Sequence, residues 1–72
     1  MTKIELSSST NSDGVLMFNV LVCGEARIAA TRDGVFAAQY ARQIYHSARG
    51  AAVIVRYDGD TGISTVLESK KQ

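Results

Sequence analysis

The sequence has few of the residues that stabilise small proteins through covalent links or metals. Its 72 residues include one cysteine, Cys23, one histidine, His46, and no proline or tryptophan. A single cysteine excludes a disulfide within one chain, and Cys23 with His46 cannot complete a structural zinc site. We therefore expect no metal and no cofactor. Because a chain this short buries little apolar surface, self-association or a partner is expected to add to its stability.

Charge of one sign and long apolar runs are also lacking. Eight Lys or Arg residues against seven Asp or Glu give a formal net charge of +1, so no bulk field directs the chain to nucleic acid or membrane. No apolar run approaches the ~20 residues that span a bilayer. The first residues, Met1 to Leu6, lack the apolar segment of a secretory signal. With the lone cysteine, these features predict a cytoplasmic protein without a membrane partner.

Catalytic patterns are lacking as well, since neither a glycine-rich phosphate loop nor a pair of catalytic carboxylates is evident. Residues 58–62, Asp-Gly-Asp-Thr-Gly, resemble the opening of a calcium loop, but Gly62 comes too early and Ser69 replaces the closing glutamate. A hairpin turn is the better interpretation. Cys23 ends an apolar segment without neighbouring charge, which is typical of an inert core thiol. We expect that the chain is not an enzyme.

The sequence does contain short apolar segments around one amphipathic helix. Residues 1–14 end in a polar run and are expected to be flexible or to form an edge strand. Residues 15–67 predict one domain with strands at 15–23, 26–30, 51–57 and 63–67 and a helix at 36–48 closed by Gly50. A type II′ turn at Gly24-Glu25 joins the first two strands. Residues 68–72 are expected to be a disordered tail.

The helix is predicted from an apolar stripe with a basic stripe opposite it. Thr31 or Asp33 can cap its first turn by accepting a hydrogen bond from a free backbone amide. The apolar stripe consists of Ala37, Ala41, Ile44 and Ala48, with Tyr40 beside it, and the basic stripe of Arg42, His46 and Arg49.

These elements predict an α+β fold of order β-β-α-β-β. The expected sheet has four antiparallel strands in the order 2-1-3-4, with the amphipathic helix packed on one face. This order places the two most apolar strands in the middle and the more polar fourth strand at an edge, which limits edge-to-edge aggregation.

The strand at residues 15–23 is apolar on both faces, which is unusual for a sheet with one solvated side. We take one of these faces as a dimer or partner face, to be covered by a second copy, a partner protein or the N-terminal segment. This face comprises Leu16, Phe18, Val20 and Val22, and the other face comprises Val15, Met17, Leu21 and Cys23.

The predicted topology also gathers charge at one end of the sheet. An acidic pole, formed by Asp13, Asp33, Asp58 and Asp60, can imitate phosphate spacing toward a basic partner, or can serve only the turns in which aspartate is common. The basic helix stripe can bind nucleic acid, or can be an ordinary solvated face, which the balanced net charge favours.

Three segments carry a resemblance to a family. The run from Phe18 to Ala29, the alanine-rich helix and the run from Gly50 to Gly59 are similar to small proteins of phages and mobile elements. In size and layout they resemble anti-CRISPR proteins. The resemblance implies a stoichiometric inhibitor that binds a protein subunit of a CRISPR–Cas complex in the bacterial host and blocks DNA engagement. The alternatives are a dimeric nucleic-acid-binding protein that uses the basic helix face, and a homodimeric structural module.

Overall fold

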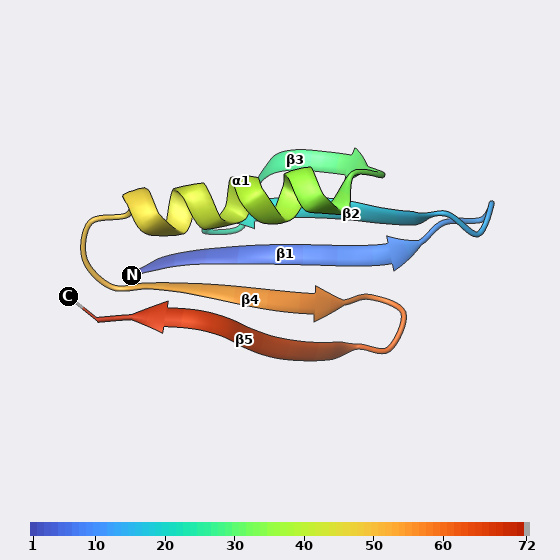
Figure 1. Ribbon diagram of the computed structural model, residues 1–72. Helices are drawn as coiled ribbons and strands as arrows, with labels where there is room; N and C mark the ends of the chain where they lie inside the picture. The colour runs from blue at the N-terminus through green and yellow to red at the C-terminus, as the bar shows by residue number, and fades with distance from the viewer. Residues whose placement is uncertain (72) are drawn as a thin grey trace.

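The middle of the sheet is formed by the N-terminal segment. The computed structural model describes residues 1–71. The elements are β1 (Thr2–Thr10), β2 (Leu16–Val22), β3 (Glu25–Thr31), α1 (Gly34–Ser47), β4 (Ala52–Asp58) and β5 (Ile63–Lys70). The strands form one sheet in the order β3-β2-β1-β4-β5 (Figure 1). Because β1 is parallel to β4 while the other neighbouring strands are antiparallel, the sheet is mixed.

The predicted α+β class is confirmed, but the predicted sheet is wrong. The observed sheet has five strands, whereas four were predicted. Strand β1 lies between β2 and β4, which were expected to be neighbours. The reason is that β1 forms a ladder on each side. Ile4 lies opposite Val22 on β2 and opposite Ile54 on β4. All three side chains are buried under the helix.

The expectation that residues 1–14 are flexible or form an edge strand is therefore wrong for Thr2–Thr10. The wrong expectation came from the serines, because a run of small polar residues is typical of a loop. In the structure Ser8 is 1% exposed, and its hydroxyl oxygen accepts a hydrogen bond of 2.7 Å from Nη2 of Arg56. Because Arg56 on β4 satisfies the hydroxyl group, Ser8 can be buried without an unpaired polar atom.

The C-terminal end of the chain also differs from the expectation. Residues 68–72 were expected to be disordered, yet β5 continues to Lys70. The ammonium group of Lys70 donates to the carbonyl oxygen of Ala48 at 2.9 Å and lies 5.0 Å from the ring centroid of Tyr45. These contacts with the end of α1 hold the last residues of β5 in place. Gln72 lies outside the described residues.

One face of the sheet is covered by α1, which contacts β1 to β4 (Figure 1). Ala37 and Ala41 of the predicted apolar stripe are buried, and Ile44 and Ala48 pack at the margin of the core. The small alanines let the helix approach the sheet closely. The core consists of Ile4, Leu6, Val20, Val22, Ala37, Ala41, Tyr45, Ala52 and Ile54.

Both ends of α1 have defined caps. Of the two predicted N-caps, Asp33 is the one that acts, because its Oδ1 accepts a hydrogen bond from the amide of Phe36 at 2.9 Å. Thr31 instead accepts from the amide of Asp33. The helix ends at Ser47, one residue before the predicted end, since Ala48 has an extended backbone with ψ of 133°.

The turn between β2 and β3 is shifted by one residue from the prediction. Cys23 and Gly24 have φ angles of 51° and 84°, and positive values at both central residues define a type I′ hairpin turn. Glu25 then begins β3 opposite Val22. Cys23 consequently lies exposed at the tip of the hairpin and is not a core thiol.

The central position of β1 predicts a large effect of mutating its buried residues. We expect Ile4→Ala to lower the free energy of unfolding by about 3 kcal/mol, because it opens a cavity between α1 and two ladders. Urea denaturation followed by circular dichroism measures this change. Lys3→Ala, on the opposite face of the same strand, is the control and should stay within about 0.5 kcal/mol of wild type. An unchanged midpoint for Ile4→Ala would contradict the central placement of β1.

Candidate functional site

The second face of the sheet carries no helix (Figure 1). Successive side chains of a strand point to opposite faces, so residues that alternate with buried Ile4, Leu6 and Ser8 lie on this side. The registers extend the assignment to the neighbouring strands. We call this surface the open face; it comprises Lys3, Glu5, Ser7, Ser9, Met17, Asn19, Leu21, Val53, Val55, Tyr57, Ser64 and Val66.

The open face is striped. Its middle column, on β1, is polar throughout, whereas the columns on β2 and β4 are largely apolar. Leu21 and Val55 lie on either side of Glu5, and Asn19 and Tyr57 lie on either side of Ser7. On β5, Val66 continues the apolar row beyond Val55 and is 60% exposed. The face can therefore bury apolar side chains of a partner while offering charges and hydroxyl groups along its centre line.

The predicted dimer or partner face is not this surface, and the structure contradicts its assignment. Val20 and Val22 are 0% and 8% exposed in the core beneath α1. Phe18 packs against the same core, and only Leu16, at 43% exposed, reaches solvent to a large extent. The helix covers the face that was expected to meet a partner. Asn19, on the other face of the strand, was the residue that could have indicated which side is solvated.

The four aspartates of the predicted acidic pole lie in segments at the same end of the sheet (Figure 1). Three of them have structural partners. Asp33 caps α1, and Oδ1 of Asp58 accepts from the amide of Asp60 at 2.9 Å. The carboxylate of Asp60 accepts from the amide and hydroxyl of Thr10, at 3.0 and 2.7 Å. Asp13 lies exposed in the turn after β1. These contacts favour a role in turns over a role in binding.

The hydrogen bonds from Thr10 also change the acidity of Asp60. The backbone amide of Thr10, followed by its hydroxyl, favours the ionised carboxylate and holds the pKa of Asp60 below its ordinary value of 3.8. The contact ties the β4–β5 turn to the end of β1. Residues 58–62 thus form the expected hairpin turn between β4 and β5, where the amide of Gly62 donates to the carbonyl oxygen of Asp58 at 2.7 Å.

The basic residues predicted on the helix remain at the surface. Arg42 and His46 are exposed on α1, and Arg49 is exposed just after it. Nη1 of Arg42 lies 3.8 Å from Oε2 of Glu68 on β5, so part of its charge is compensated within the chain. The stripe is therefore accessible but carries less net charge than the sequence suggested.

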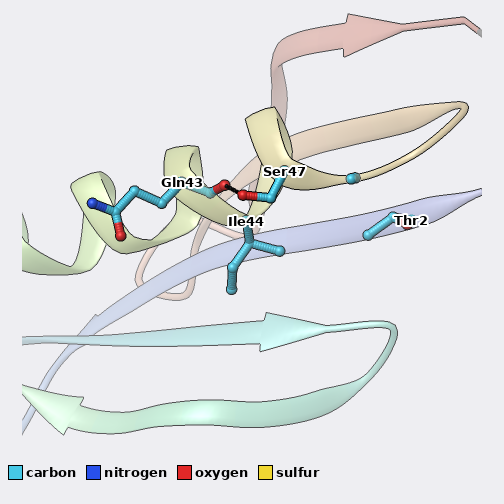
Figure 2. Close-up of a pocket in the computed structure, with 5 residues that line it drawn as sticks. Thr2, Gln43, Ile44 and Ser47 are labelled. Carbon is cyan, nitrogen blue, oxygen red and sulfur yellow. Dashed lines mark hydrogen bonds between the residues drawn. The ribbon is translucent and has the colours of Figure 1, made fainter.

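A small depression lies beside the C-terminal turns of α1. It has a volume of about 390 Å³ and is lined by Thr2, Gln43, Ile44, Ser47 and Ala48 (Figure 2). The hydroxyl of Ser47 donates to the carbonyl oxygen of Gln43 at 2.7 Å, so its hydrogen is already used within the helix. The lining offers no charged or nucleophilic pair, so the open face is the better candidate for function.

No protein-family model, curated protein or solved structure matches the chain. Within residues 1–71, no group of three His, Cys, Asp or Glu side chains is arranged to hold a metal ion. The one helix in this range, with 14 residues, is too short and too polar to cross a membrane.

The contact between Thr10 and Asp60 predicts a measurable change in acidity. In Thr10→Val the hydroxyl donor is lost while the backbone amide remains, so the pKa of Asp60 should rise part of the way toward 3.8. An NMR titration of the Asp60 carboxyl group measures it. An unchanged pKa of Asp60 in Thr10→Val would contradict the contribution of the hydroxyl group.

The lowered pKa also fixes the sign of a stability effect. Because the folded pKa lies below the unfolded value, Asp60 contributes stability above the unfolded pKa, and this contribution is lost as the pH falls through the folded pKa. Asp60→Asn should therefore destabilise the protein more at pH 7 than at pH 2, as thermal melts at both values would show. An equal loss at both would contradict the role of the ionised carboxylate.

Proposed function

We propose that this chain is a small non-enzymatic binding protein that holds a protein partner on its open face. The observation that supports the proposal is the striped surface opposite α1. Its apolar columns on β2 and β4 have no covering layer within the described residues, and its polar column on β1 lies between them. Specific protein interfaces combine apolar contact area with direct hydrogen bonds, and this face offers groups for both.

The dimensions of the molecule agree with this use. It measures 42 × 21 × 19 Å, with the long axis along the strands (Figure 1). The open face is shorter than the whole molecule, because its strands β1, β2 and β4 have seven to nine residues and span roughly 23–30 Å at ~3.3 Å per residue. Its area is of the same order as the roughly 800 Å² that each partner contributes to a standard interface. One face can therefore hold a partner without a further domain.

As the target of this binding we propose a subunit of a CRISPR–Cas complex. In this proposal the chain is a phage-derived stoichiometric inhibitor that acts in the cytoplasm of the bacterial host and blocks DNA engagement. The resemblance of residues 15–67 to anti-CRISPR proteins supports the target class. The balanced net charge and the structural engagement of Asp33, Asp58 and Asp60 support contact with protein through the open face, rather than imitation of DNA by the acidic end.

The test uses purified CRISPR–Cas complexes of several types and titrates the chain against each. Calorimetry would measure binding, and a DNA-binding assay of the same complex would measure inhibition. We expect Val55→Lys to weaken binding about thirtyfold, which corresponds to about 2 kcal/mol, because it places a charge in the apolar column beside Glu5 and Val66.

Gln39→Lys is the matched control, since it adds the same charge on the exposed side of α1. This variant should bind within about twofold of wild type. Circular dichroism of both variants shows whether the fold is kept. Wild-type affinity in Val55→Lys, or a comparable loss in Gln39→Lys, would remove the open face as the binding surface.

The alternative is a dimeric nucleic-acid-binding protein that uses Arg42, His46 and Arg49. Its support is that all three residues are exposed. Gel shifts with DNA and RNA at low salt separate the two functions, because phosphate contacts weaken steeply as salt is added. A salt-sensitive shift that is lost in Arg49→Gln and kept in Val55→Lys would favour this alternative over the protein-binding proposal.

A further inference from the structure

The open face carries two opposite charges at neighbouring positions of its polar column. Lys3 and Glu5 are separated on β1 by Ile4, which is buried under α1, so both of their side chains lie on the open face. Within residues 1–71 the two ion pairs lie elsewhere, one on β3 and one between α1 and β5. Neither Lys3 nor Glu5 has an ion-pair partner there. Both charges are therefore available to a surface that lies against this face.

The neighbours of these two charges on the open face are apolar. On β4, Val53 lies beside Lys3 and Val55 lies beside Glu5. On β2, Leu21 lies on the other side of Glu5. All three apolar side chains are half-buried. A surface that covers this region must offer apolar area at the flanks and the inverse order of charges in the middle.

A second copy of the same face meets this requirement. Two sheets that pack face to face lie about 10 Å apart, with strand directions within about 30° of each other. If the two β1 strands run in opposite directions across the gap, Lys3 of each copy lies over Glu5 of the other, and Val53 lies over Val55. If they ran in the same direction, like charges would meet. Because β1 is the middle strand, the angle between the sheets displaces its residues least.

We propose that two copies of this chain stack through their open faces, related by a twofold axis that runs across the strands at the level of Ile4. The apolar columns provide most of the contact area, and the two contacts between Lys3 and Glu5 set the orientation, as charges at interfaces commonly do. The overlap is about seven residues long and five strands wide, or roughly 1,000 Å² for both copies. This area is near the lower limit of about 1,000 Å² for specific interfaces, so the dimer is reversible.

The dimer covers the surface on which the proposed protein partner is held, and this consequence alone rests on the proposed function. A chain must leave the dimer before it binds the partner, so self-association regulates how much of the chain is free to bind. The dimer is measured on the isolated chain. Its absence would leave the proposed partner binding intact, and a failure of partner binding would leave the dimer intact.

Sedimentation equilibrium of the full chain over a range of concentrations tests the stacking. With increasing concentration the mass of wild type should rise from 7.7 kDa toward twice that value. In Lys3→Glu, both contacts related by the twofold axis become repulsive, so we expect the dissociation constant of the dimer to rise at least about thirtyfold. Glu5→Lys should have the same effect, because it makes the same two contacts repulsive between positive charges.

Exchange of the two charges separates this contact from a loss of folding. The double variant Lys3→Glu/Glu5→Lys restores opposite charges across the axis, so its dissociation constant should return to within about threefold of wild type. Arg49→Glu is the matched control, because it reverses a charge that is exposed just after α1. It should dimerise as wild type does. Circular dichroism of each variant shows whether the fold is kept.

Three results would overturn the proposal. One is a wild-type mass of 7.7 kDa at the highest soluble concentration. Another is a dimer that neither Lys3→Glu nor Glu5→Lys weakens, which would assign the contact to a different surface. The third is a folded double variant that dimerises as weakly as the single variants, which would show that the two residues do not face each other across an axis.

Discussion

The hydrogen bonding of β1 on both of its sides is the constraint on which the rest of the structure depends. One ladder joins it antiparallel to β2 and the other joins it parallel to β4. Ile4, Leu6 and Ser8 are thereby placed at the centre of the face that α1 covers. Without β1, the two hairpins β2–β3 and β4–β5 would have no common neighbour. The helix, which contacts strands of both hairpins, would then have no continuous surface on which to pack.

A single helix over a five-stranded sheet leaves the molecule with two unlike faces. The covered face contains the entire core and is stabilised at its margins by long side chains, such as Lys70 on Ala48 and Arg56 on Ser8. The other face keeps its apolar columns half-exposed on either side of a polar strand. Polar residues on β1 prevent this face from becoming one large apolar patch, which favours solubility. The same stripes give a partner a defined register.

Local features of the sequence were sufficient for the α+β class, for α1 and for the Asp58–Gly62 turn, because the helical periodicity, the cap at Asp33 and the turn residues act over a few positions. The sheet order was not predictable in this way. Ser7, Ser8 and Ser9 look like a loop until the long-range contact with Arg56 is known. The prediction of the partner face was wrong for a related reason. Val20 and Leu21 are both apolar, and only the position of α1 decides which of them is buried. The acidic residues were placed at the correct end, but the contact of Asp60 depends on a tertiary partner, Thr10.

The parallel pairing of β1 with β4 also determines the order in which the protein can fold during synthesis. Ile4 and Ile54 are neighbours in the sheet but are fifty residues apart in the chain, and closing so long a loop is costly and slow. The hairpins of β1, β2 and β3 leave the ribosome first, and one side of β1 stays unpaired until β4 follows. A nascent chain of this protein therefore exposes for a time, at its centre, the kind of strand edge that the finished protein keeps only at its margins. Chaperones that bind extended apolar strands would meet it at that stage.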